Sequence, residues 1–462
     1  MRRVLVVGAN AAGATAASFA RKTDREAEIV VVEREPYSTY SRCGLPFLIS
    51  GEIGSFEELI TYRPEHFKAM RIDLRLESEV VEVDRESRVA MVRTRGGDVE
   101  ELEYDSMILC TGARAWKPPV KGMDLEGVHT LRTMQDCLSI MRELKHAKKC
   151  VVVGAGPVGL EVAAALRMKG LDVTVVELLD SVLPASLDPD MARRVQRVVE
   201  REGIKVLLKS PVEEIVGGER VTSVHAGGLE VEADLVVVAT GVRAETELGR
   251  RMGLAVGPTG CFRTDARMRA LEEGRGRPVE GVYCAGDCAE SVHMVSKTPS
   301  APQLGTSAVR MGRVAGINAA GGYCTFPGVL GTFASKIFDL EVGSTGLSER
   351  HAERMGLQVV SGRVSWKTRA EYFPGALPVT VKVVADLETT RVVGCQVVGG
   401  ENVVGRVNAA ALAIQAGMTL QDLVKADFGY TPPLADIWEP LALAAERALR
   451  NLKRLNRGRS RL

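Results

Sequence analysis

The sequence predicts an α/β protein of two or three domains, on three observations. The chain has 462 residues, which exceeds the size of one compact hydrophobic core. Hydrophobic residues make up 45% of the chain and aromatic residues only 5%, so its cores should consist mainly of aliphatic side chains. A pattern of strand, glycine-rich turn, helix and strand occurs twice, as in parallel sheets that are covered by helices.

The charges of the chain are balanced. It has 60 Lys and Arg residues against 59 Asp and Glu residues, which is a formal net charge of +1. Such a chain has no overall field that would attract nucleic acid or anionic lipid, so neither is expected as a partner. A long apolar stretch, residues 151–176, is interrupted by charged side chains, and no membrane span is expected.

The N-terminus and the cysteines favour the cytoplasm. The start, MRRVLVVGAN, is too short an apolar run for a signal peptide, and we expect it to be the first strand. Nine cysteines without the spacing of a disulfide framework are typical of reduced thiols. We therefore expect a cytoplasmic protein in which most cysteines are buried.

The first glycine-rich unit begins at the N-terminus. Residues 3–8 form an apolar strand, GANAAG follows, residues 14–22 resemble a helix, and residues 28–34 form a second strand. Glycines here would let the backbone approach a pyrophosphate at the start of the helix, and the acid that ends the second strand could bind ribose hydroxyls. Asn10 replaces the middle glycine of the usual fingerprint. The candidate cofactor-binding residues of this unit are Gly8, Asn10, Ala11, Gly13, Glu33 and Arg34.

The second unit, KCVVVGAGPVGLEVAAALRMKGLDVTVVELLD, has all three glycines at the standard spacing: Gly154, Gly156 and Gly159. Glu177 ends its second strand and is followed by two leucines, so no arginine is placed to pair with a 2′-phosphate. NADH is therefore favoured, and NADPH stays possible. Two Rossmann-like domains in one chain indicate two dinucleotides, a nicotinamide carrier and FAD.

A third motif, EGVYCAGDCAE, is an apolar strand that ends at Asp287. A carboxylate in this position could hold the ribityl hydroxyls of a flavin. Cys284 and Cys288 flank it, but no further Cys or His cluster completes a metal site, so no metal is expected.

The C-terminal part of the chain, residues 324–462, has a different pattern. In residues 378–399 valines alternate, pause at a turn and resume, which predicts a hairpin, and residues 401–417 predict an amphipathic helix. The last thirteen residues, RNLKRLNRGRSRL, are basic without an acid and are expected to be a solvated, mobile tail.

In this order the motifs resemble the pyridine nucleotide-disulfide oxidoreductases over nearly the whole chain, including LCTGARAWKPP and VVATGVRAETEL. The turns Thr111-Gly112 and Thr240-Gly241 resemble the crossings between the two nucleotide domains of that family. The resemblance implies a glutathione reductase-like fold and a homodimer in which each chain completes the other's active site. The implied domains are an FAD-binding domain (1–112 and 243–323), an NAD(P)-binding domain (113–242) and an α+β dimerisation domain (324–462).

The segment TYSRCGLPF contains the candidate redox residue, Cys43. The dithiol members of the family carry a second cysteine five residues on, where this chain has Leu48. The C-terminal His-Glu pair of the glutathione reductase type is also missing, because the last histidine of the chain is His351. The sequence thus resembles the single-cysteine branch: coenzyme A disulfide reductases, persulfide reductases, NADH oxidases and NADH peroxidases. A thiol at a helix start beside Arg42 is expected to have a lowered pKa. Arg42 stands where coenzyme A disulfide reductases often have asparagine.

Three further residues enter through this resemblance. Oxidases and peroxidases of the branch usually have a histidine in the first glycine loop, where this chain has Ala11. Disulfide and persulfide reductases use tyrosines of the partner chain to protonate a leaving thiolate, and Tyr372 and Tyr430 match them. Glu161 is expected near the nicotinamide.

The sequence thus predicts an FAD-dependent NAD(P)H:disulfide oxidoreductase. Its substrate would be coenzyme A disulfide, coenzyme A persulfide or polysulfide, with Arg21 and Lys22 as candidates to bind the 3′-phosphate of coenzyme A. The first alternative is an NADH oxidase that reduces oxygen at the flavin. The second alternative is a flavin-loaded redox sensor.

Overall fold

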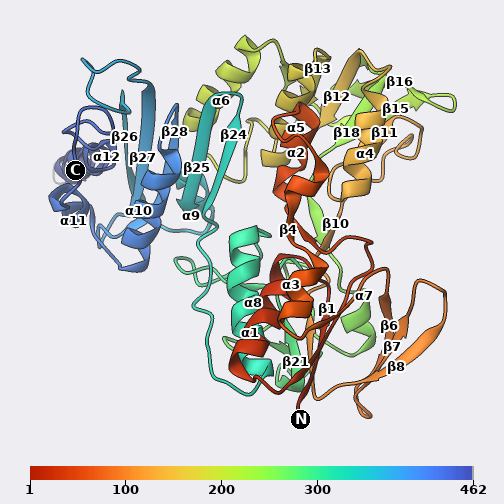
Figure 1. Ribbon diagram of the computed structural model, residues 1–462. Coiled ribbons are helices and arrows are strands. Elements are labelled where there is room, and N and C mark those ends of the chain that lie inside the picture. The colour runs from red at the N-terminus through yellow and green to blue at the C-terminus, as the bar shows by residue number, and fades with distance from the viewer. Residues whose placement is uncertain (460–462) are drawn as a thin grey trace.

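The computed structural model describes residues 1–459, so the last three residues of the basic tail lie outside the described residues. Figure 1 shows three units, each built on its own main sheet. We call the elements within residues 3–109 and 247–319 the first unit, those within residues 128–238 the second unit, and those within residues 333–459 the third unit. The expected α/β fold with a separate α+β C-terminal part is confirmed.

A six-stranded sheet with the order β20-β21-β9-β1-β2-β5 forms the centre of the first unit. All neighbours in it are parallel except β20 and β21. Its strands are β1 (Arg3–Val7), β2 (Glu28–Val32), β5 (Asp73–Arg75), β9 (Ser106–Leu109), β20 (Arg269–Leu271) and β21 (Pro278–Cys284). The helices of the unit are α1 (Ala11–Thr23), α2 (Leu45–Ser50), α3 (Pro64–Ala69), α7 (Glu247–Arg251) and α8 (Gly305–Ala319).

The first unit also contains short strands and two 3-10 helices, which comprise Arg42–Gly44 and Phe56–Leu59. A small antiparallel sheet has the order β6-β7-β8, and β3 pairs with β4. The bounds are β3 (Thr39–Tyr40), β4 (Ile60–Tyr62), β6 (Glu79–Asp84), β7 (Val89–Arg93) and β8 (Val99–Glu103). Between β21 and α8 in the sequence, β22 (Ser291–Val292) pairs with β23 (Pro299–Ser300).

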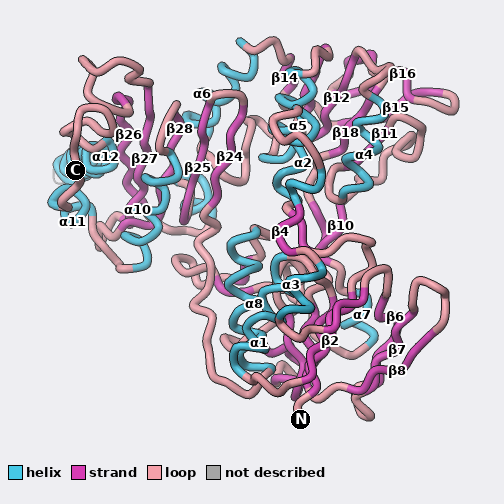
Figure 2. The backbone as a smooth tube through the Cα atoms, viewed as in Figure 1, coloured by secondary structure: helices cyan, strands magenta, loops and turns pink. Residues whose placement is uncertain are grey.

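Helices α1 and α8 lie side by side although they are far apart in the sequence (Figures 1 and 2). Their backbones touch because α8 presents glycine where they meet. A side chain at Gly312 would overlap the carbonyl oxygen of Ala12, and one at Gly316 would overlap that of Ala16. This contact joins the two halves of the first unit, which precede and follow the second unit in the sequence.

The second unit has a parallel five-stranded sheet with the order β11-β18-β12-β13-β14 and an antiparallel sheet β15-β16-β17. Its helices are α4 (Met134–Glu143), α5 (Pro157–Met168) and α6 (Pro189–Arg201). Its strands are β11 (Val128–Thr130), β12 (Lys149–Val153), β13 (Asp172–Val176), β14 (Lys205–Leu207), β15 (Val212–Gly217), β16 (Val221–Ala226), β17 (Leu229–Glu232) and β18 (Leu235–Val238).

The two connections between these units run side by side as an antiparallel pair, β10 (Ala113–Ala115) with β19 (Val242–Ala244). The Thr111 hydroxyl donates to the carbonyl of Glu245 at 2.6 Å, and the Thr240 hydroxyl donates to that of Trp116 at 2.8 Å. Gly112 and Gly241 both have positive φ, +69° and +107°, so each Thr-Gly turn depends on glycine.

The third unit is an antiparallel five-stranded sheet with the order β24-β25-β28-β27-β26. The expected hairpin is β27 (Pro378–Asp386) with β28 (Val392–Gly399), and the expected helix is α10 (Val403–Gln415). The other elements are β24 (Phe333–Ile337), β25 (Leu340–Gly346), α9 (Glu349–Arg354), β26 (Val359–Lys367), α11 (Leu420–Lys425) and α12 (Pro440–Arg459).

The expectation of a mobile tail is wrong for residues 450–459, which continue helix α12. Leu441, Ala445 and Ala448 of this helix are buried, so its apolar face is held in a core. Gly362 of β26 allows that contact, because a side chain there would overlap the backbone of Ala444 and Ala448. Across residues 1–459 no helix has both the length and the apolar character that a membrane span requires.

The contact between α1 and α8 yields a prediction. The Gly316→Ala variant should unfold at a lower temperature, with a loss of about 1 to 3 kcal/mol, because a methyl group meets the rigid backbone of α1. The matched control is Gly305→Ala in the first turn of α8, where no atom lies within 4 Å of the added methyl group. Thermal unfolding followed by circular dichroism compares the two, and equal melting temperatures would contradict the role of this contact.

Candidate functional site

The turn after β1 can be formed only with glycine at two positions. Gly8 has φ of +102°, and a side chain there would overlap the carbonyl oxygen of Cys110. A side chain at Gly13 would overlap the carbonyl oxygen of Gly8. Helix α1 therefore begins directly against the end of β1, and its first backbone N–H groups face the turn.

Asn10 takes the place of the middle glycine and caps α1. Its side-chain oxygen accepts a hydrogen bond from the N–H of Ala11 at 2.8 Å. Its amide nitrogen is buried, yet it has no hydrogen-bond partner among the described residues. A buried donor of this kind requires a partner, and a bound phosphate or ribose oxygen at the helix start would supply one. The turn therefore fits the expected dinucleotide.

Glu33 lies at the end of β2 and is buried. Its carboxylate accepts hydrogen bonds from the N–H of Ala9 at 2.7 Å and from the N–H of Glu35 at 3.0 Å. Burial raises the pKa of this carboxyl group, and the two hydrogen bonds oppose that change. Arg34 is exposed and lies 4.0 Å from Glu245. Glu33 thus shapes the turn itself, and its contact with ribose stays a prediction.

The second turn repeats this design. Gly154 has φ of +105°, and a side chain at Gly159 would overlap the carbonyl oxygen of Gly154. Gly156 has no neighbouring atom within 4 Å of an added side chain, so the space above it is open. Glu177 accepts from the N–H of Ala155 at 2.7 Å and of Leu179 at 2.9 Å, as Glu33 does in the first turn.

Asp287, at the end of β21, binds an arginine that sequence reasoning missed. Arg132 of the second unit forms an ion pair with it at 2.5 Å and donates to the carbonyl of Ala113 at 3.2 Å. Arg132 precedes Thr133, the N-cap of α4, whose capping box with Asp136 holds the local backbone. That capping box is readable in the sequence, but the direction of the arginine side chain is not.

Cys43 is exposed and lies in the 3-10 helix that leads into α2. Helix α2 has Pro46 in its first turn and ends at Gly51, whose φ is +85°. Although α2 follows the first turn in the sequence, it packs against α4 and α5 of the second unit. The position of Cys43 is therefore set by the contact between the two units.

The expectation that Arg42 lowers the pKa of Cys43 is wrong. Arg42 instead pairs with Glu35 at 2.6 Å and lies over the ring of Tyr40. The protein atoms around Cys43 raise its pKa by desolvation, although its surface is open to solvent, and the negative charge of Glu161 raises it further. The nearby positive charge that lowers it belongs to Arg132.

Glu161 lies on α5, and its carboxylate accepts a hydrogen bond from the Ser335 hydroxyl of β24 at 2.7 Å. Burial raises the pKa of Glu161 to about 7. The structure thus brings Cys43, Asp287, Arg132 and Glu161 together from the first and second units, with Ser335 from the third.

Tyr372 and Tyr430 lie in the third unit, and their hydroxyls are 3.1 Å apart. Tyr372 is 76% exposed and Tyr430 is 45% exposed. The hydrogen bond with Tyr372 raises the pKa of Tyr430. Tyr372 follows β26, the edge of the sheet opposite β24, and β24 is the strand that packs against α5. Figure 1 shows the width of this sheet between β26 and α2, so one chain does not bring the tyrosines to Cys43.

The two residues proposed for the coenzyme A phosphate differ in what they contact. The Arg21 guanidinium donates to backbone carbonyls, including those of Met70, Arg71 and Ala27, and so holds local structure. Lys22 is exposed and lies over the ring of Phe19.

Comparison with known sequence families assigns the chain. The family described as pyridine nucleotide-disulphide oxidoreductase matches residues 2–312. Its dimerisation domain matches residues 332–442.

Curated relatives and solved structures match this chain over nearly its full length. A relative from Methanocaldococcus jannaschii, named NADH oxidase, is 40% identical and covers 97% of this chain and 99% of its own. A relative from Pyrococcus horikoshii, named NAD(P)H coenzyme A polysulfide/persulfide reductase, is 34% identical and covers 96% of this chain and 98% of its own. The structure of an NAD-dependent persulfide reductase from A. fulgidus superposes with a TM-score of 0.93 at 36% identity, and covers 98% of this chain and 84% of that one.

The motifs, the fold and these matches lead to one assignment. The two glycine turns, the crossing strands and the C-terminal sheet occur in the order of the matched family, across both of its domains. The chain belongs to the pyridine nucleotide-disulphide oxidoreductase family and is an oxidoreductase that uses FAD and NAD(P)H.

Proposed function

We propose that this protein reduces a small disulfide or persulfide with electrons from NAD(P)H, and that Cys43 is its redox-active cysteine. The observation that carries the proposal is the exposure of the thiols. Cys43 is exposed, whereas the other eight cysteines are buried or half-buried. All nine are free thiols, which fits a reducing, cytoplasmic compartment.

The proposed substrate is coenzyme A disulfide, coenzyme A persulfide or polysulfide. The names of the relative from Pyrococcus horikoshii and of the solved structure from A. fulgidus support this class. Each of these substrates supplies the second sulfur of the reaction, so one protein thiol is sufficient.

The chemistry begins when the Cys43 thiolate attacks the S–S bond of the substrate. A mixed disulfide forms on Cys43, and the other sulfur leaves as a thiolate that takes up a proton. Two electrons that originate from NAD(P)H then reduce the mixed disulfide and release the second thiol. FAD, when bound, supplies the electron carrier between nicotinamide and sulfur.

We assign FAD to residues 1–112 and 243–323, with Asn10, Glu33 and Asp287 among its ligands. The nicotinamide nucleotide belongs to residues 113–242, where Gly156 leaves open space for a pyrophosphate. NADH is favoured because exposed Leu178 and Leu179, rather than an arginine, follow Glu177.

We propose a homodimer in which the tyrosine pair of one chain faces Cys43 of its partner. The hydrogen bond between Tyr372 and Tyr430 fits a proton donor for the leaving thiolate. Leu434, Ile437 and Trp438, close to Tyr430 in the sequence, are exposed apolar side chains that a partner chain would cover.

A second candidate function is reduction of oxygen by NADH. It is favoured by the 40% identical relative from Methanocaldococcus jannaschii, which is named NADH oxidase. Ala11 argues against peroxide chemistry that depends on a histidine in the first turn.

The first prediction of the proposed function tests Cys43 directly. In enzyme reduced anaerobically with NADH, coenzyme A disulfide or polysulfide should reoxidise the flavin rapidly, and Cys43→Ser should abolish this reaction. Cys324→Ser, which changes a half-buried thiol, is the matched control. Reoxidation by air alone that is indifferent to Cys43 would instead establish the oxidase.

The second prediction tests the shared site. Tyr430→Phe should lower disulfide turnover by about a hundredfold, because it removes the proton donor while the ring remains. When Cys43→Ser and Tyr430→Phe chains are mixed and allowed to exchange, each hybrid dimer has one intact site, and about a quarter of the wild-type activity should return. Mixtures that stay inactive after confirmed exchange would argue against a site built from two chains.

The third prediction concerns Glu161 and Arg132, two of the three charged groups that act on Cys43; the third, Asp287, also raises the pKa of Cys43. Above pH 7 Glu161 is ionised and opposes the thiolate, so Glu161→Gln should lower the pKa of Cys43 and speed its alkylation by iodoacetamide. Arg132→Gln should raise that pKa and slow alkylation at the same pH. The measurement is the alkylation rate from pH 6 to about 10. Changes of equal sign in both variants would contradict this arrangement of charges.

A further inference from the structure

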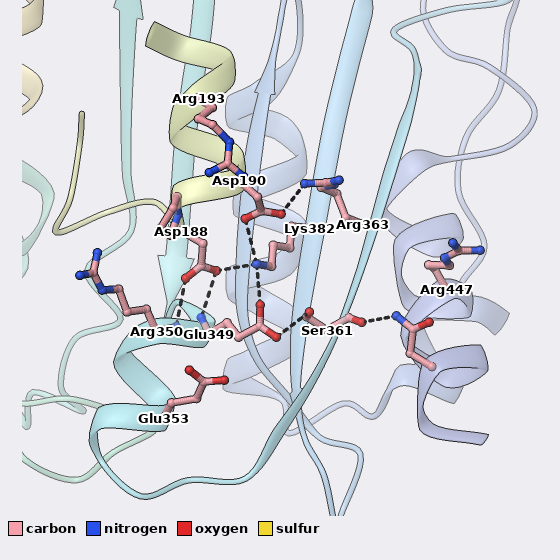
Figure 3. Close-up of a pocket in the computed structure, with 12 residues that line it drawn as sticks. Asp188, Asp190, Arg193, Glu349, Arg350, Glu353, Ser361, Arg363, Lys382 and Arg447 are labelled. Atoms are coloured by element: carbon pink, nitrogen blue, oxygen red, sulfur yellow. Dashed lines mark hydrogen bonds and ion pairs between the residues drawn. The ribbon is translucent and has the colours of Figure 1, made fainter. Parts of the chain in front are cut away.

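Among residues 333–459, the third unit buries two cations that differ in what they join. Lys382 of β27 pairs with Asp188 at 3.0 Å and Asp190 at 3.1 Å, which belong to the second unit (Figure 3). Arg406 of α10 is 4% exposed, and its one ion pair within residues 1–459 is with Glu439 of the third unit itself. Removing a guanidinium from water costs free energy, so a buried arginine requires strong partners.

The Arg406 guanidinium holds the segment that carries Tyr430. Its Nε donates to Glu439 Oε1 at 2.8 Å, and its Nη2 donates to Oε2 at 3.4 Å. The same carboxylate accepts a hydrogen bond from the N–H of Leu441 at 3.2 Å, in the first turn of α12. Residues 426–439 form no helix or strand, so this contact fixes one end of an otherwise irregular segment.

The other side of the guanidinium reaches the loop that carries Tyr372. Nη1 of Arg406 donates to the carbonyl of Glu401 at 3.3 Å. The Glu401 carboxylate in turn accepts hydrogen bonds from Arg369 through both of its oxygens. Arg369 lies in the loop between β26 and β27, three residues before Tyr372. One arginine therefore contacts both tyrosine-bearing segments, directly or through one further ion pair.

Backbone contacts at the base of the loop complete the arrangement. The N–H of Thr368 donates to the carbonyl of Leu377 at 2.8 Å, which closes the loop. The N–H of Gly400 donates to the carbonyl of Pro378 at 3.3 Å, and a side chain at Gly400 would overlap Leu377. The loop is therefore held against the turn that leads into α10, where Glu401 lies.

We propose that Arg406 is a positioning residue for the tyrosine pair in disulfide or persulfide reduction. A chain of contacts from Arg369 through Glu401 and Arg406 to Glu439 links two segments whose tyrosine hydroxyls lie 3.1 Å apart. Two guanidinium groups face two carboxylates, so the charges of this chain are balanced within the protein. The inference rests on the proposed function, in which the tyrosine pair protonates the leaving thiolate.

The physical requirement for such a residue is geometric. A proton donor must lie within hydrogen-bond distance of the leaving sulfur, and a displacement of about 1 Å can lower a rate about a hundredfold. Tyr372 and Tyr430 are exposed and lie on irregular segments, so contacts at the ends of those segments must set their positions. Arginine suits this role because its planar guanidinium binds both oxygens of one carboxylate and a carbonyl at the same time, which a lysine ammonium does not match.

The test is a double-mutant cycle in the FAD-loaded enzyme, with reduction of coenzyme A disulfide by NADH as the first readout. Arg406→Gln and Arg369→Gln are each combined with Tyr430→Phe. The Arg369 side chain is 21% exposed, so its variant tests the same chain of contacts if Arg406→Gln does not fold. The matched control is Arg75→Gln, which removes an arginine that bridges two acids in the first unit. Melting temperatures report the folding of every variant.

The second readout is the ultraviolet titration of the Tyr430 phenolate, taken as the difference from the same chain with Tyr430→Phe. The hydrogen bond with Tyr372 raises the pKa of Tyr430, so a variant that separates the two hydroxyls should lower that pKa. A residue that only stabilises the fold would change the melting temperature and leave this titration unchanged.

We expect Arg406→Gln and Arg369→Gln each to lower kcat about tenfold or more, but less than about twofold when Tyr430→Phe is already present. The pKa of Tyr430 should fall in both variants, and Arg75→Gln should change neither readout. Losses that add in full to that of Tyr430→Phe, or an unchanged phenolate titration in both arginine variants, would overturn the proposal. If Tyr430→Phe itself leaves turnover intact, the proposed proton donor fails, and the titration then decides separately whether Arg406 positions the pair.

Discussion

The structure depends on the contact between α1 and α8, where two backbones touch because α8 offers Gly312 and Gly316. That contact returns the chain to the N-terminal unit after the second unit has been inserted. It lies just beyond the segment that carries Asp287, and a side chain at Gly286 would press on Ala12 of α1. The first glycine turn and Asp287 therefore share one rigid frame, and the proposed flavin site exists only when both halves of the first unit are joined.

The reactivity of Cys43 is decided where the units meet. Its thiol lies on a segment of the first unit that packs against helices of the second, and Arg132 and Glu161 act on it with opposite sign. Desolvation by the surrounding protein, with the charge of Glu161 second, leaves the pKa of Cys43 raised. The tyrosine pair, in contrast, is displayed at the far side of the third unit, which is consistent with a site that two chains build together.

A buried ion-pair cluster forms a second junction between units. Lys382 of β27 pairs with Asp188 and Asp190 at the start of α6 and with Glu349 of α9, so these contacts join the second and third units. Both the redox site and this ion-pair cluster thus use residues from different units. Movement between the units would alter either site.

Local sterics and spacing along the chain are enough to predict the glycine turns, the motif around Cys43, the Val-rich hairpin and the family from the sequence. The sequence did not determine which arginine acts on Cys43, since the neighbour Arg42 turns to Glu35 while distant Arg132 approaches. Nor did it reveal that residues 450–459 of the basic tail continue α12, whose buried alanines pack on β26. Side-chain direction and helix docking are set by contacts between distant segments, which exist only in the folded chain.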